Sequence, residues 1–591
     1  MFGYKSVCEM FLTMDCEDSP TLNRKGKEWL DSYKTSNNFG GHVSTKINAI
    51  IDISLWKEIL NEIKSSLKDE CDFLTEILNE TLYNLRDSKE IASKLYNDFN
   101  YYFQTAEDHE IYANKDEVVD LDIDVRDIYI LGRLLAPVLI SGCTIRIHPI
   151  NDSIVPYLVA FGDILVDCGV PKGGKYVFFT NVVEDPKRLT FNGFSSFHCC
   201  PMLLFEESDL DSALDCLIES SFRFNGMLYW SVTHAYIQES IFDVIVSKLL
   251  DYSQRSQHLE FINCGQHNQL NMIHNSTPTF FTGWDPRELE LEYDLNMSVC
   301  LLPFRTTDEV VSLVSMLGGA SAASIWTDKL SVANRVIKLL KIDNIWVNSH
   351  GLITPSVPFE SCFETKLPFN GYPLLEYLTR VKDLSSELFL DTHILESDDW
   401  KKENKHLFRC SVAEAVDFAI EGYKVLSKLD DLAMHNLFSL LLSEKFKINM
   451  VSKIASRLDS IYHPFSKVDV LCYKSSYEIV MITCVCIDVD KAFFLQLLFC
   501  LIATRNAVIV NAVPDVLHKI SRILPPTLPK GIVTLINVKD MTRFSSQYKR
   551  IGKYLHLYFN SNIESSRNFG EDTRYLCSLF SKRKLVWLQN E

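Results

Sequence analysis

The sequence predicts an α/β protein built on parallel sheets, and three observations point to this class. Apolar stretches with helical spacing alternate with short strand-like runs, and turns containing Gly or Pro separate them. The order helix, Gly/Asn turn, strand, helix, Pro-Lys-Gly turn, strand occurs twice, which predicts an internal duplication. The chain of 591 residues is also several times longer than a usual domain, so two or three domains are expected.

The first copy starts with helices over residues 56–103, where leucine and isoleucine recur at spacings of three and four residues. The acidic stretch from Asp108 to Val119 is interpreted as a loop. The elements expected next are a helix at Ile128–Ile140, a strand at Thr144–Ile147, a helix at Ile154–Val166 and a strand at Tyr176–Val183.

A second α/β stretch runs from Asp209 to about Asn348, with helices near Asp209–Ser221 and Thr307–Leu317. Residues Lys382–Lys405 are rich in Asp, Glu, Ser and Lys, and they are interpreted as a linker. The second copy then repeats the pattern, with helices at Val412–Phe446 and Ala492–Thr504 and strands at Ala507–Val510 and Ile532–Val538.

Charge and composition exclude several classes of protein. The chain has 59 basic and 77 acidic residues, and the net charge of −18 disfavours binding to nucleic acid or to an anionic membrane. Its 17 cysteines are too few for a disulfide scaffold. The charged stretch Met1–Asp18 is not expected to be a signal peptide, and the apolar stretch Phe493–Thr504 is too short to span a bilayer. We therefore expect a cytoplasmic protein.

Several segments in the first 380 residues resemble the aldehyde dehydrogenase superfamily. They are Leu135–Pro149, Phe191–Gly193, Pro201–Asp211, Ile237–Phe242, Ala322–Trp326 and Ile345–Asn348. A complete-looking first unit followed by a truncated second unit is similar to family 16 of this superfamily. The stretches His350–Pro358 and Lys584–Leu588 also resemble that branch.

The resemblance implies a Rossmann-like parallel sheet, a second α/β domain of catalytic type, and a truncated repeat of the Rossmann-like unit. The expected parts are a leader at 1–20, a degenerate dinucleotide-binding-type domain at 21–200, a degenerate catalytic-type domain at 201–360, the family's C-terminal oligomerisation segment at 361–381, the linker at 382–405 and a truncated second aldehyde-dehydrogenase-like domain at 406–591.

The family's catalytic residues are not found at the matching positions. Its reaction uses a cysteine nucleophile, a glutamate base, and an asparagine amide that holds the oxyanion. The resemblance places Trp230 at the cysteine position, Ser195 at the glutamate position and Val125 at the asparagine position. No cysteine lies between Leu217 and Asn263 to replace the nucleophile. The resemblance therefore implies a degenerate catalytic site.

The family's NAD site is also altered. The resemblance places its remnants at His148, Gly193 and Tyr293. Gly193 is followed by Pro201 only eight residues later, whereas the family has a helix and a strand there, and the N-terminus of that helix faces the pyrophosphate. No cofactor is therefore expected. The cluster His198-Cys199-Cys200 lacks a second ligand pair, so buried structural cysteines are favoured over a metal site.

Three functional hypotheses stay open at this point. The first is a catalytically inactive homologue, a pseudoenzyme that acts through an unidentified protein partner. The second is an NAD-dependent oxidoreductase acting on aldehydes, with Cys362 as a displaced nucleophile. The third is a regulator that binds a small molecule or nucleotide in the remnant cleft. The family resemblance implies a homodimer through edge strands, unless the second unit covers that edge, as family 16 suggests.

Overall fold

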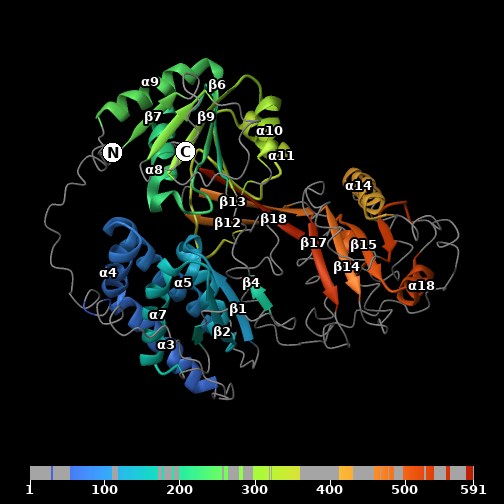
Figure 1. The fold of residues 1–591 in the computed structure, drawn as a ribbon, viewed down its shortest axis with the longest axis horizontal. Coiled ribbons are helices and arrows are strands. Elements are labelled where there is room, and N and C mark those ends of the chain that lie inside the picture. Colours follow the sequence, from blue (N-terminus) through green and yellow to red (C-terminus); the bar gives the residue numbers. More distant parts are fainter. Residues whose placement is uncertain are drawn as a thin grey trace. The chain divides into compact units, whose positions relative to one another are not determined.

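The computed structural model describes residues 28, 30, 53–108, 118–170, 176–178, 189–191, 199–255, 259–263, 278–283, 297–317, 320, 322–357, 359, 411–429, 458–465, 468–476, 478–484, 497–498, 500–524, 528–537, 554–559 and 581–589 (Figure 1). The chain divides into two compact units. The first contains Met1–Arg380, Ile461–Leu471 and Leu585–Glu591, and the second contains Val381–Ser460 and Cys472–Lys584.

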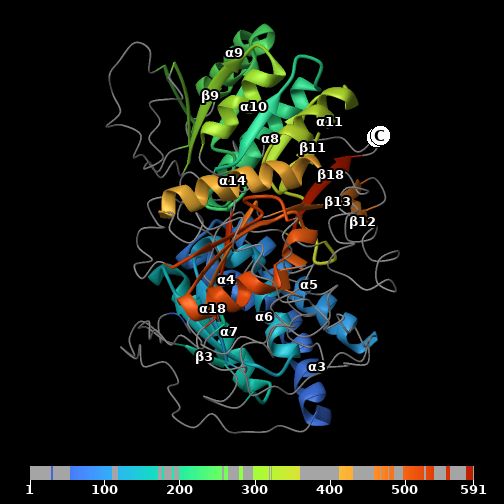
Figure 2. The ribbon, with the colours of Figure 1, turned by 90° about the vertical axis from the view of Figure 1, so that its right-hand side faces the viewer.

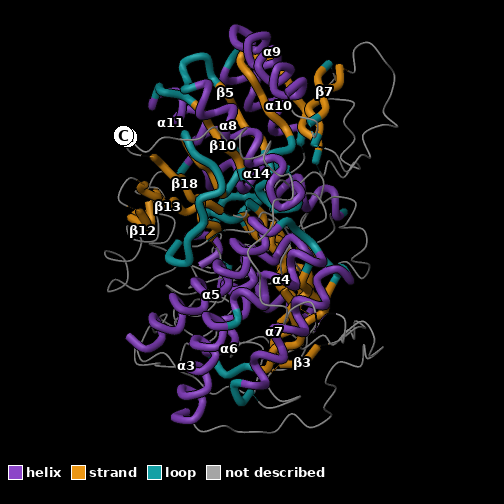
Figure 3. The backbone as a smooth tube through the Cα atoms, turned by 90° about the vertical axis from the view of Figure 1, so that its left-hand side faces the viewer, coloured by secondary structure: helices purple, strands orange, loops and turns teal. Residues whose placement is uncertain are grey.

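The first unit begins with three helices, as predicted from the leucine and isoleucine spacing. They are α3 (Ile53–Asp69), α4 (Cys71–Thr81) and α5 (Leu85–Asp108). Their apolar faces are buried, and the Trp56 indole donates a hydrogen bond to the Leu139 carbonyl at 3.0 Å. Figure 3 shows these helices beside the helices that flank the first sheet.

The first sheet is parallel and four-stranded, in the order β3-β2-β1-β4. Its strands are β1 (Val118–Ile123), β2 (Thr144–Pro149), β3 (Tyr176–Phe178) and β4 (Leu189–Phe191). Its helices are η1 (Val125–Ile130), α6 (Leu131–Ile140), η2 (Asp152–Ile154) and α7 (Val155–Asp167). The predicted loop at 108–119 was wrong at its end, because β1 begins at Val118. Two aspartates in this strand, Asp120 and Asp122, make it look like part of the acidic loop, while Val119, Leu121 and Ile123 are buried.

The second sheet has ten strands, in the order β12-β13-β18-β11-β10-β5-β6-β9-β8-β7. Seven of them follow one another along the chain: β5 (Pro201–Leu204), β6 (His234–Gln238), β7 (Glu260–Asn263), β8 (Thr279–Thr282), β9 (Ser298–Phe304), β10 (Ala323–Trp326) and β11 (Asn344–Val347). The helices between them are α8 (Leu210–Phe222), η3 (Arg223–Gly226), α9 (Glu239–Arg255), α10 (Thr307–Met316) and α11 (Leu330–Leu339). Every pair among these seven neighbouring strands is parallel, as predicted for the second α/β stretch.

The remaining three strands of this sheet come from the last third of the chain. They are β12 (Leu458–Phe465), β13 (Val468–Ser476) and β18 (Ser581–Gln589). Strand β18 pairs in parallel with β11, in a register that joins Asn344 to Leu585 and Trp346 to Trp587.

The unit boundaries therefore differ from the predicted ones. Two segments of the predicted domain at 406–591 belong to the first unit, namely Ile461–Leu471 and Leu585–Glu591. Strand pairing joins these segments to the second sheet. The predicted domains at 21–200 and 201–360 both lie within that first unit. The predicted leader, oligomerisation segment and linker lie outside the described residues.

The second unit contains a parallel sheet in the order β16-β15-β14-β17. Its strands are β14 (Ile479–Cys484), β15 (Ala507–Ala512), β16 (Val533–Ile536) and β17 (Tyr554–Phe559). This order repeats that of the first sheet, with β14 in the place of β1. The repeat predicted from the sequence is therefore present in the strand topology.

Two helices of the second unit are α14 (Val412–Lys428) and α18 (Pro514–Ile523) (Figure 2). Helix α14 packs its buried alanine and valine side chains against β14, β15 and β16. At Gly422, a Cβ would collide with the carbonyl of Gly531, which itself has a φ of +84°. The Pro-Lys-Gly turn that marks the repeat in the sequence thus ends in a glycine that α14 requires.

Candidate functional site

Trp230, which the sequence resemblance aligns with the family's nucleophile, lies four residues before β6 and is 4% exposed. The Tyr129 ring meets the indole edge-on at 5.5 Å between centroids, and the Phe359 ring does so at 5.3 Å. The Trp230 carbonyl accepts a hydrogen bond from His350 Nε2 at 2.8 Å. Aromatic side chains therefore enclose this position.

The segment that carries His350 and Phe359 is held from α6. Arg133 is fully buried, and its guanidinium donates hydrogen bonds to the carbonyls of Thr354 at 2.9 Å and Val357 at 2.6 Å. Removing a charged group from water is costly unless hydrogen bonds replace the water. These two bonds fix the path of the segment over Trp230.

Val125 opens η1 and is 5% exposed, so the predicted position of the oxyanion-binding residue lies inside the fold. Its carbonyl accepts a hydrogen bond from the Tyr83 hydroxyl at 3.5 Å. An isopropyl side chain has no N–H to donate, so Val125 cannot supply the amide that would stabilise an oxyanion. Tyr129 of η1 contacts the Trp230 ring, so the two positions lie in the same part of the first unit.

A buried carboxyl group, which the sequence did not single out, links the same two segments. Asp127 of η1 accepts a hydrogen bond from the Tyr229 hydroxyl at 2.9 Å and another from the Asp124 amide at 2.8 Å. Burial raises the pKa of Asp127 to about 7. The capping pattern of Asp124 and Asp127 is visible in the sequence, but a partner 102 residues away is not.

The loop before Trp230 has an unusual backbone. Phe224, Asn225 and Gly226 all have positive φ values, of 53°, 55° and 63°. Two of these residues carry a Cβ, for which this region is strained. The carboxylate of Asp87 holds the loop by accepting from the Phe224 amide at 3.0 Å and from Arg223 Nε at 3.0 Å. The backbone of this loop is therefore fixed by contacts from α5.

A thiol and an imidazole meet at the start of β5 and β6, where the sequence analysis favoured structural cysteines. Cys199 Sγ lies 3.4 Å from His234 Nδ1, and the Thr233 hydroxyl contacts both atoms, at 3.4 and 2.9 Å. Burial raises the pKa of Cys199 to about 12 and lowers the pKa of His234 to about 4. At neutral pH the pair is an uncharged thiol and an uncharged imidazole, which is not an activated nucleophile.

The other predicted site residues are placed as follows. His148 lies in β2, in register with Asp122 of β1, and is 8% exposed. Ser195, Cys362, Gly193 and Tyr293 lie outside the described residues. Within the part of the chain that the structure describes, no group of three or more His, Cys, Asp or Glu side chains could hold a metal ion.

No protein-family profile matches the chain. It is similar to several solved structures at low identity. An oxidoreductase from Marinobacter aquaeolei is 17% identical over 56% of this chain and 85% of its own, with a TM-score of 0.47. A succinate-semialdehyde dehydrogenase from Burkholderia pseudomallei is 16% identical over 55% and 83%, with a TM-score of 0.45. An NAD-dependent aldehyde dehydrogenase from Sinorhizobium meliloti is 16% identical over 52% and 77%, with a TM-score of 0.44.

Among the described helices, none combines the length and the apolar composition that crossing a bilayer requires.

Proposed function

We propose that this chain is a catalytically inactive member of the aldehyde dehydrogenase superfamily, similar to family 16, that acts through protein–protein interaction. The observation that carries the proposal is the burial of Trp230 between Tyr129 and Phe359, at the place of the family's nucleophile. An indole in this place cannot act as the thiolate that attacks the aldehyde carbonyl and carries the thioester.

The surrounding groups support the same conclusion. Val125 has no donor for an oxyanion, and the nearby thiol of Cys199 is buried beside an uncharged imidazole. Making the thiolate would require a buried negative charge, which the environment opposes by raising the pKa to about 12. Aldehyde oxidation by the family's route therefore lacks its first step.

The resemblance aligns His148 and Asn151 with the Lys and Glu by which the family holds the adenosine ribose of NAD, and neither residue fits that role. His148 is largely buried in β2, although the family uses a flexible lysine there to reach the ribose. The Asn151 side-chain oxygen caps η2, accepting from the Ser153 amide at 2.9 Å and from its hydroxyl at 2.8 Å. Neither side chain is therefore placed to hold the ribose, and the proposed function includes no nicotinamide step.

The pairing of β18 with β11 indicates that a strand from the C-terminal part of the chain covers one edge of β11. The family resemblance implies that subunits pair through edge strands, and in this chain β11 is paired with a strand from the same chain. A strand edge that is already paired cannot accept another strand. We therefore propose that the C-terminal segment covers this edge, and that a protein partner binds elsewhere.

Titration with NADH tests the proposal. Nicotinamide fluorescence and the melting temperature are followed up to about 5 mM NADH, a concentration at which binding with a millimolar Kd would still be detected. We expect no saturable change in either signal. Saturable binding in the micromolar range would overturn the proposal and favour the oxidoreductase hypothesis, which an aldehyde screen with Cys362→Ala as the comparison would then examine.

A further inference from the structure

A polar cleft opens at the carboxyl ends of the central strands in the second sheet. It has a volume of about 280 Å³ and lies at the opposite ends of β5 and β6 from Trp230 and Cys199. Its lining comes from the residues after β5, the end of β6, the residues after β9, and α11: Phe205, Glu206, Glu207, Gln238, Arg305 and Arg335 are among them.

The strand order explains why a cleft opens at this position. Strands β5 and β6 are followed by α8 and α9, whereas β9 and β10 are followed by α10 and α11, and the two pairs of helices lie on opposite faces of the sheet (Figure 1). Where neighbouring parallel strands send their connections to opposite faces, the loops separate and leave a crevice, which is the usual ligand position in open α/β sheets. Two such points flank β5 and β6, one between β10 and β5 and one between β6 and β9, and the cleft lies over the carboxyl ends of β5, β6 and β9.

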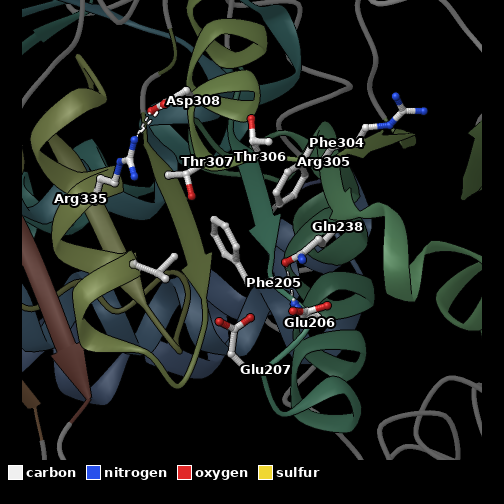
Figure 4. Close-up of a pocket in the computed structure, with 11 residues that line it drawn as sticks. Phe205, Glu206, Glu207, Gln238, Phe304, Arg305, Thr306, Thr307, Asp308 and Arg335 are labelled. Carbon is white, nitrogen blue, oxygen red and sulfur yellow. Dashed lines mark hydrogen bonds and ion pairs between the residues drawn. The ribbon is translucent and has the colours of Figure 1, made fainter.

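The cleft combines an aromatic floor with polar walls. The Phe205 and Phe304 rings meet edge-on at 5.2 Å, and both residues are buried. Figure 4 shows Glu206, Glu207 and Gln238 on one side of these rings and the Arg335–Asp308 pair on the other. A ligand that enters would therefore meet ring surface at depth and charged groups at the mouth.

The charges of the cleft do not balance. Arg335 pairs with Asp308, Arg305 with Glu239, and Lys329 with Glu207, each at 2.8 Å. The Glu206 carboxylate accepts a hydrogen bond from the Ser240 hydroxyl at 2.7 Å, and it shares the charge of Lys329 with Glu207. One lysine therefore serves two carboxylates, and the mouth keeps an excess of negative charge at the exposed Glu206.

We propose that this cleft receives an arginine side chain from a protein partner. The guanidinium pairs with the Glu206 carboxylate, and Gln238 and the small exposed part of Phe205 line the space beside it. The net charge of −18 attracts a basic partner over a distance. This inference rests on the proposed role in protein interaction and adds a position and a partner chemistry to it.

A peptide titration tests the inference on the full chain. The probe is a fluorescein-labelled nine-residue peptide, (Gly-Ser-Arg)₃, followed by anisotropy at 50 and 150 mM NaCl. We expect saturable binding that Glu206→Gln weakens at least about fivefold, since a charge-assisted pair is lost. The matched control is Glu421→Gln, which removes the same charge from an exposed site on α14 and should change the affinity less than about twofold.

Three results would overturn the inference. The first is equal weakening of peptide binding by the two variants. The second is equal binding of a peptide with citrulline in place of arginine. The third is no binding to the unmodified chain up to about 1 mM peptide, where the binding free energy would be only about 4 kcal/mol. A lysine version of the peptide should bind more weakly, because an ammonium cannot form the bidentate pair. The NADH titration is independent of Glu206, so failure here and failure of the pseudoenzyme proposal are told apart.

Discussion

The amino and carboxyl ends of strands β5 and β6 have contrasting surroundings. Near their amino ends, Trp230 contacts Tyr129 and Phe359, and the polar pair Cys199–His234 is buried. At their carboxyl ends, ion pairs surround an open cleft over Phe205 and Phe304.

The two ends differ in how much buried apolar surface they hold. The aromatic side chains at the amino end bury apolar surface, which stabilises the first unit. The carboxyl end keeps polar and exposed side chains that contribute little to stability. The two ends should therefore respond very differently to substitution, and four measurements examine this.

The largest effect is expected for Trp230→Ala. The indole is buried between two rings, so its removal leaves a cavity and should cost about 3–5 kcal/mol in the free energy of unfolding. Urea unfolding and the melting temperature measure the loss, and Trp230→Phe should keep more than half of the stability. An unchanged melting temperature for the alanine variant would show that the amino end is not closed in solution.

The next effect concerns the reactivity of Cys199 toward iodoacetamide at pH 8. Because the thiol is buried and its pKa is raised to about 12, alkylation in the native protein should be on the order of a hundredfold slower than in the urea-unfolded chain. Peptide mass spectrometry gives the rate at each cysteine. The half-buried Cys71 serves as the internal comparison and should react faster than Cys199. Rapid labelling of native Cys199 would indicate an open amino end.

A pH effect is expected from Asp127. Its pKa is raised from 3.8 to about 7, so the folded state binds its proton more tightly than the unfolded state does. The stability from this group is present below pH 4 and is lost as the pH rises toward 7, with about 2 kcal/mol lost between pH 5 and 7. Asp127→Asn does not titrate, so its stability relative to the unmodified chain should increase over this range. Melting curves at pH 5, 6 and 7 measure the trend, and a constant difference would contradict it.

The smallest effect is expected at the carboxyl end. Arg335 and Asp308 have side chains that are 59% and 68% exposed, so Arg335→Ala should change the free energy of unfolding by less than about 1 kcal/mol. Measured under the same urea conditions, this variant provides the contrast to Trp230→Ala. A loss as large as that of the tryptophan variant would mean that the cleft is part of the stabilising core.

Much of the fold is readable from local patterns. Helical spacing and Gly or Pro turns predicted α6, α7, β2 and β15, since buried faces impose their period on the apolar residues. Strand β1 was missed because Asp120 and Asp122 occupy alternate positions and hide its apolar face. The alignment of Trp230 with the family's cysteine position also comes from the sequence alone, and it stays a prediction.

Contacts between distant residues required the tertiary structure. The pairing of β18 with β11, the Tyr229–Asp127 hydrogen bond and the approach of Cys199 to His234 join segments up to about 240 positions apart, which no local period records. The cleft at the carboxyl ends of β5, β6 and β9 arises in the same way, from the order of the strands in the sheet. Residue types and their spacing establish the elements, while burial, charge pairing and the open cleft depend on how the sheet is assembled.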